Sequence, residues 1–144
     1  MSEYKKPYVI AEAGCNHKGD MEIAKELINV AAMFCHADAI KFQKRCPKEL
    51  TPEQYNAPHP NPENSYGNTY GAHREFLEFT VDQHAQLKEW CEEAGITYAT
   101  SVWDMTSARE ITSLKPKFIK IPSACNTHYE MLQWLCDNYQ GEIQ

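Results

Sequence analysis

Three charged side chains stand at or near the carboxyl ends of predicted strands: Glu12, Lys41 and Lys120. Parallel α/β proteins and barrels build their sites at that end, so a carboxylate and two ammonium groups are expected to meet at one rim. Unpaired charges there are costly, and these groups must pair with one another or with a ligand. Two lysines suit a small polyanion. The alternative is that each lysine reaches solvent or forms a plain ion pair.

Uncharged polar side chains accompany the lysines. Because side chains alternate along a strand, Gln43 is expected to share a cavity with Lys41. Ser101 and Ser123 lie close to the ends of the two following strands, and their hydroxyl groups could donate to phosphate or carboxylate oxygens. A single serine at a strand end is more often a turn former, so both interpretations stay open.

Histidine and cysteine could also contribute to a site. His17 follows Asn16, and the two residues either form an Asx-type turn ahead of a helix or take part in the site. The 6 cysteines include no Cys-x-x-Cys pair, and nothing indicates export. We therefore expect reduced thiols and no zinc site.

Predicted strands and helices alternate along the chain. Strands are expected at 8–12, 37–43, 96–102 and 118–121, with the start of a fifth at 142–144. Helices are expected after Asp20, from Thr80 to Gly95, from about 106 to 114 and from 129 to 136. This order implies parallel strands joined by right-handed crossovers, in a doubly wound sheet or a (β/α) barrel. Since no Gly-x-Gly-x-x-Gly follows the first strand, a barrel is preferred.

The segment 44–79 interrupts this alternation. It carries most of the 8 prolines, at positions 47, 52, 58, 60 and 62, so a long helix cannot run through it. A connection of this length inside a compact domain is usually a lid or a binding loop, and residues 70–79 could add a short helix at its end. The alternative is a poorly ordered insertion.

The composition is that of an ordinary globular domain, with 42% hydrophobic and 24% charged residues among 144. A net charge of −6 argues against a nucleic-acid binder or a basic membrane-surface protein, because both need a dense cationic face. No apolar run approaches the length of a membrane span, and no signal core precedes the first strand. We expect a cytoplasmic protein without nucleic-acid or membrane partners.

Four motifs together resemble those of the sialic acid synthase family. They are IAEAGCNHKGD at 10–20, ADAIKFQKR at 37–45, TSVWD at 100–104 and KIPSACN at 120–126. The resemblance implies a parallel (β/α)₈ TIM-barrel-type fold, of which residues 1–144 would form the N-terminal half, about the first four βα units. It also implies condensation of phosphoenolpyruvate with a 2-acetamido sugar such as N-acetylmannosamine, with release of phosphate.

The resemblance assigns roles to the strand-end residues. The equivalents of Lys41, Lys120, Ser101 and Ser123 bind phosphoenolpyruvate in the family. Those of Glu12 and Gln43 face the sugar, and an asparagine of the long loop, either Asn64 or Asn68, touches it. One position departs from the pattern: family members often carry a glutamate where this chain has Cys125. A thiol does not readily accept the same proton at neutral pH, so catalysis would rest on Glu12 or the chain would use another sugar.

The family also uses a divalent metal, manganese or magnesium, as a Lewis acid. Its histidine ligands come from later strands, so the resemblance offers none of the 6 histidines here as ligands. It implies a homodimer at full length, and we expect this chain to be inactive alone. Two alternatives stay open. One is another phosphoenolpyruvate-dependent keto-sugar-acid synthase, and the other is a non-catalytic half-barrel that pairs through its open sheet edge.

Overall fold

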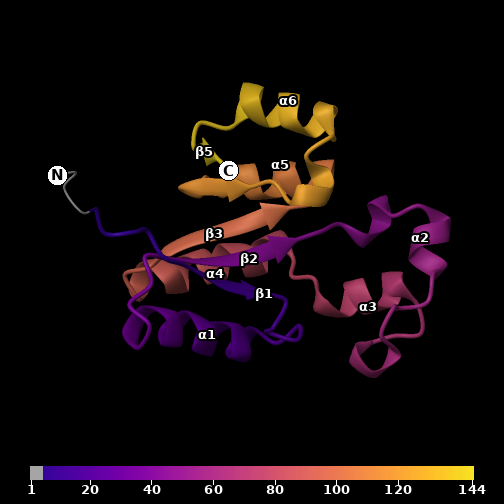
Figure 1. The fold of residues 1–144 in the computed structure, drawn as a ribbon, viewed down its shortest axis with the longest axis horizontal. Helices are drawn as coiled ribbons and strands as arrows, with labels where there is room; N and C mark the ends of the chain where they lie inside the picture. The colour runs from indigo at the N-terminus through magenta and orange to yellow at the C-terminus, as the bar shows by residue number, and fades with distance from the viewer. Residues whose placement is uncertain (1–4) are drawn as a thin grey trace.

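A parallel sheet of five strands, in the order β1-β2-β3-β4-β5, forms the centre of the protein (Figure 1). The computed structural model describes residues 5–144, and residues 1–4 of the predicted domain lie outside them. The strands are β1 Ile10–Gly14, β2 Ala39–Lys44, β3 Thr97–Val102, β4 Phe118–Lys120 and β5 Glu142–Ile143. The predicted strands, including the start of a fifth, are therefore confirmed, as is their parallel arrangement.

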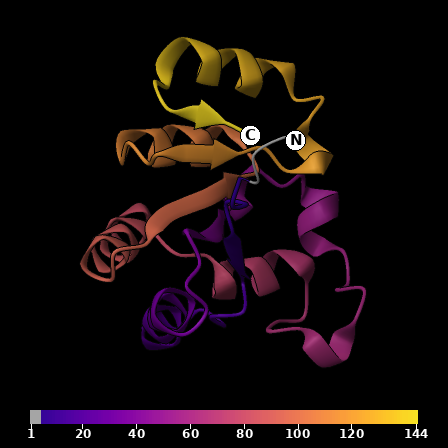
Figure 2. The same ribbon diagram turned by 60° about the vertical axis from the view of Figure 1, so that its left-hand side comes forward.

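Helices follow the strands and cover one side of the curved sheet (Figure 2). They are α1 Met21–Met33, α4 Val81–Glu93, α5 Met105–Ser113 and α6 Tyr129–Asn138. Successive members of this series contact one another, so they form one outer layer. In the part of the chain that the structure describes, no helix has the length and apolar character needed to cross a bilayer.

Polar caps set the helix boundaries where the sequence predicts them. The Asp20 side chain accepts hydrogen bonds from the first free backbone N–H groups of α1. Thr80 and Gln83 form the expected capping box at the start of α4. After α4 the chain turns at Gly95, whose φ of +70° is a left-handed conformation that glycine adopts without strain. The Asp104 side chain caps α5 in the same way as Asp20 caps α1.

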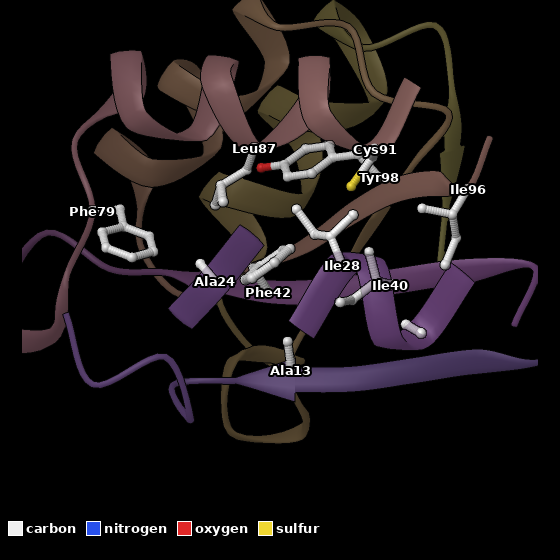
Figure 3. Close-up of a cluster of buried hydrophobic side chains, with 11 residues drawn as sticks. Ala13, Ala24, Ile28, Ile40, Phe42, Phe79, Leu87, Cys91, Ile96 and Tyr98 are labelled. Atoms are coloured by element: carbon white, nitrogen blue, oxygen red, sulfur yellow. The ribbon is translucent and has the colours of Figure 1, made fainter. Parts of the chain in front are cut away.

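The main core lies between β1, β2 and β3 and the helices α1 and α4 (Figure 3). Ile40 and Phe42 of β2 point into it, where they pack with Ile28 of α1 and Leu87 of α4. Burying each such side chain contributes about 1.5–3 kcal/mol. Because β2 alternates, this packing directs Lys41 and Gln43 to the opposite, concave side of the sheet, as the sequence predicts.

Strand β1 differs from the prediction in its bounds. It runs from Ile10 to Gly14 instead of 8–12, so Glu12 lies in the middle of the strand. The strand stops at Gly14, whose φ is +57°, and the pairing with β2 shifts between Glu12 and Gly14. This irregularity brings the end of β1 close to the side chains of β2.

The segment between β2 and α4 is more ordered than the proline content suggests. It contains η1 Pro47–Glu49, α2 Pro52–Asn56, η2 Pro62–Asn64 and α3 Tyr70–Leu77. Three of these elements start with a proline, which fits the first turn of a helix because it needs no N–H there. The helix predicted at 70–79 is confirmed as α3. The segment lies beyond the carboxyl ends of β1 and β2 (Figure 1).

Candidate active site

Glu12, Lys41 and Ser101 meet on the concave side of the sheet. Glu12 of β1 is paired in register with Lys41 of β2, and their side chains form an ion pair. The Lys41 Nζ also donates to the Ser101 Oγ of β3, at 3.2 Å. The side chain of Lys41 is only 13% exposed, whereas that of Glu12 is 49% exposed. The ammonium group is thus held inside the sheet's concave face, with the carboxylate on its solvent side.

Gln43 extends this cluster. Its Nε2 donates to Glu12 Oε1 at 3.4 Å, so the predicted proximity of Gln43, Glu12 and Lys41 is observed. Its Oε1 accepts from Arg45 Nη2 at 2.6 Å. The backbone of Gly14 lies against the pair, because an added Cβ there would be 3.4 Å from both Gln43 Nε2 and Glu12 Oε1. That distance is an ordinary van der Waals contact, so the need for glycine at position 14 comes from its φ of +57° and not from crowding.

Lys120 and Ser123 come from the fourth strand. Lys120, the last residue of β4, is paired in register with Ser101, which places it on the same face as the cluster. Ser123 lies in the short helix η3 Ser123–Cys125 and is exposed. Within residues 5–144, no hydrogen bond joins its hydroxyl group to the other five predicted residues. Of the six predicted residues, four are therefore connected by hydrogen bonds or an ion pair, namely Glu12, Lys41, Gln43 and Ser101. Lys120 lies beside them, and Ser123 lies on the adjoining turn.

Cys125, at the position where the family resemblance leads us to expect a glutamate, is held by the neighbouring strand end. Its thiol donates to the Trp103 carbonyl at 3.3 Å. Burial raises the pKa of this thiol, Asp104 adds to the increase, and the cations Arg45 and Lys120 oppose it. A thiol with a raised pKa stays protonated at neutral pH, so Cys125 does not supply the negative charge of a glutamate.

Arg45 is a site neighbour that the sequence analysis missed. Its backbone N–H donates to Glu78 Oε2 at 2.9 Å, and its guanidinium lies 3.4 Å from Glu78 Oε1. The guanidinium carbon lies 3.9 Å from the centre of the Trp103 ring. Burial raises the pKa of Glu78, while the Arg45 guanidinium and backbone N–H lower it. The sequence did offer one signal for Arg45, because in KFQKR a cation directly follows the polar end of a predicted strand.

His17 serves the turn and the core. Its Nδ1 accepts from the Gly19 N–H at 3.1 Å, and its ring stacks on Phe79 with 4.1 Å between centroids. Burial lowers its pKa to about 4, against a small opposite effect of a backbone hydrogen bond with Gly14. Since its ring also lies near Phe42, it is on the helix side of the sheet, opposite Lys41. Of the two interpretations of His17, the structure favours the turn.

A cavity of about 310 Å³ lies between the strand ends and the long connection. Arg45, Arg74, Trp103 and His128 are among its lining residues, and none of the six predicted site residues lines it. Among the residues from 5 to 144, no three His, Cys, Asp or Glu side chains are grouped so that they could hold a metal ion. The divalent metal that the resemblance implies therefore has no group of ligands among these residues, and it stays a prediction.

The family follows from comparison with known sequences. The sequence pattern of the NeuB family matches residues 27–143. The chain belongs to the NeuB family. The human N-acetylneuraminate-9-phosphate synthase is 34% identical over 131 residues, which cover 88% of this chain and 35% of the human protein. The N,N'-diacetyllegionaminic acid synthase of Legionella pneumophila is 34% identical over 134 residues, with the same two coverages.

Solved structures agree with this membership. An N-acetylneuraminic acid synthetase from Leptospira borgpetersenii, solved with citrate, has a TM-score of 0.74 and 25% identity over 93% of this chain and 42% of its own. The spore coat polysaccharide biosynthesis protein spsE of Bacillus subtilis has a TM-score of 0.66 and 28% identity over 96% and 36%. The predicted TIM-barrel-type fold is confirmed. The chain spans about a third of the length of its NeuB relatives.

Proposed function

We propose that this chain carries part of the site of a sialic acid synthase-type enzyme, which condenses phosphoenolpyruvate with a 2-acetamido sugar such as N-acetylmannosamine. The observation that carries the proposal is the cluster of Glu12, Lys41, Gln43 and Ser101 on the concave face of the sheet. Lys120 stands in register beside Ser101. Membership of the NeuB family supports the same reaction class.

In this proposal the two lysines bind phosphoenolpyruvate. Its phosphate and carboxylate carry several negative charges, and ammonium groups form strong charge-assisted hydrogen bonds to such oxygens. Ser101 donates a further hydrogen bond, and Ser123 reaches the ligand from the turn after β4. Because Lys41 is already paired with Glu12, the ligand competes with the Glu12 carboxylate for the ammonium group.

The Glu12 side chain, which is half exposed, and Gln43 beside it are available to the sugar in this proposal. The proposed reaction forms a bond between C3 of phosphoenolpyruvate and the aldehyde carbon of the open-chain sugar. Water adds at C2, the bond between C2 and the phosphate oxygen breaks, and phosphate leaves. The protein's part is to hold the two substrates in line and to neutralise the charge of the leaving phosphate.

Phosphate release from phosphoenolpyruvate plus N-acetylmannosamine tests the proposal. We expect turnover by a longer protein that contains this segment and none by the 144-residue chain, since the chain spans about a third of its relatives' length. Turnover with a simple aldose phosphate but not with N-acetylmannosamine would favour the other keto-sugar-acid synthases. Turnover by the 144-residue chain would contradict the expectation that it is inactive alone.

A further inference from the structure

We propose that Arg45 is a positioning residue that fixes the side-chain amide of Gln43, so that Gln43 presents its N–H group, and not its carbonyl, to the sugar. The inference rests on the proposed function for the identity of the ligand. The orientation of the amide rests on the protein's own contacts.

A guanidinium group has five donors and no acceptor. The Gln43 atom at 2.6 Å from Arg45 Nη2 must therefore be the carbonyl oxygen. The amide NH₂ then faces the other way, toward the Glu12 carboxylate at 3.4 Å, which can only accept. In this orientation the Gln43 carbonyl accepts from Arg45 and the Gln43 NH₂ group donates to Glu12. A flipped amide would lose both hydrogen bonds, because its NH₂ group would face the guanidinium and its carbonyl would face the carboxylate.

Arg45 is itself held by two residues, Glu78 and Trp103. One carboxylate, Glu78, accepts from both its backbone N–H and its guanidinium. The face of the guanidinium covers the Trp103 ring at 3.9 Å. The side chains of Arg45 and Glu78 are 11% and 6% exposed, so solvent competes little for these contacts. Glu78, near the end of the long connection, therefore contacts the site through Arg45.

This orientation defines the group that Gln43 and Glu12 recognise together. The contact between them is long for a hydrogen bond, at 3.4 Å, and an incoming oxygen could replace it. A donor and an acceptor side by side match a hydroxyl group, which accepts from the amide and donates to the carboxylate. We therefore assign a sugar hydroxyl to this pair. With the amide free to flip, its carbonyl would repel the same oxygen.

The test uses ¹⁵N-labelled protein, in which the Gln43 side-chain signals are assigned by their loss in Gln43→Ala. Arg45→Lys keeps the charge beside Glu78 but loses the planar fork. We expect Arg45→Lys to weaken N-acetylmannosamine binding about tenfold in the presence of phosphoenolpyruvate, as for loss of one charge-assisted hydrogen bond. Phosphoenolpyruvate binding should change less than about twofold. In a Gln43→Ala background, Arg45→Lys should have almost no further effect, because its action passes through Gln43.

Arg109→Lys on α5, an exposed arginine beside Trp134, is the matched control and should change neither affinity. The proposal is overturned if Arg45→Lys weakens both ligands equally, or if its effect persists without Gln43. If neither ligand binds the wild-type chain, the proposed function fails. The NMR signals of the Gln43 amide then still test whether Arg45 positions Gln43. The positioning role is supported if the Gln43 NH₂ protons exchange slowly with solvent in the wild type and fast in Arg45→Lys. It is overturned if the exchange rate does not change.

Discussion

Acid should destabilise this protein through His84, a histidine buried in α4. Its side chain is fully buried, and its Nδ1 lies 2.8 Å from the Tyr98 hydroxyl group. Burial lowers the pKa of His84 to about 3, with smaller contributions from Lys44 and His17. An unfolded histidine has a pKa of about 6.5. Between those two values the unfolded chain binds a proton that the folded chain does not, so stability falls as pH falls.

The size of the effect follows from these two pKa values. Linkage gives about 1.4 kcal/mol per pH unit within the window, and a loss of about 2 kcal/mol between pH 7 and pH 5 from His84 alone. Glu78, whose pKa burial raises, changes stability in the opposite direction as it takes up a proton. A comparison of the wild type with a His84 variant isolates the effect of His84, because Glu78 is present in both proteins.

The assay is urea unfolding at pH 7 and pH 5, followed by circular dichroism. His84→Gln keeps a partner for the Tyr98 hydroxyl group but cannot titrate, so its loss of stability between the two pH values should be smaller by about 2 kcal/mol. His36→Asn is the control, since His36 is exposed and asparagine tolerates its φ of +49°. Equal losses in wild type and His84→Gln would refute the reasoning.

Two further predictions concern the local structure. Asp20→Ala removes the hydrogen bonds to Glu22 N and Ile23 N and should cost about 1 kcal/mol in urea unfolding, whereas Asp20→Ser should retain most of the stability. An unchanged midpoint in Asp20→Ala would show that the cap is not needed. Gly71→Ala should cost about 1–3 kcal/mol, because the new Cβ would overlap the Tyr55 ring where α2 packs on α3. Thermal unfolding at the wild-type temperature would contradict this packing.

The sequence predicts the regular elements well because their signals are local. Asp20, the capping box at Thr80 and the turn at Gly95 each depend on neighbours within four residues, and each lies where expected. The side of β2 that carries Lys41 is predictable for the same reason, since alternation along one strand decides it. Of the helices in the connection, α3 was predicted, whereas η1, α2 and η2 were not, because elements of three to five residues are too short to show a helical period.

The candidate site was only partly predictable, because its contacts join distant segments. Lys41 and Ser101 are 60 residues apart, yet strand-end position and motif resemblance together identify both. Arg45 was missed because its importance depends on Glu78, 33 residues away, and on Trp103, which follows strand β3. No local pattern reports that pairing. Likewise, only the packing of the core shows that His17 faces away from the site.

Binding of phosphoenolpyruvate to the 144-residue chain, measured by isothermal titration calorimetry, tests the central claim most directly. We predict one site in the wild-type protein and an affinity at least about tenfold weaker in Lys41→Met, which keeps the apolar stem and removes the charge. Lys88→Met, which breaks the surface pair with Glu92, is the control and should bind like wild type. Equal affinities in Lys41→Met and wild type, or no binding to wild type at all, would contradict the account.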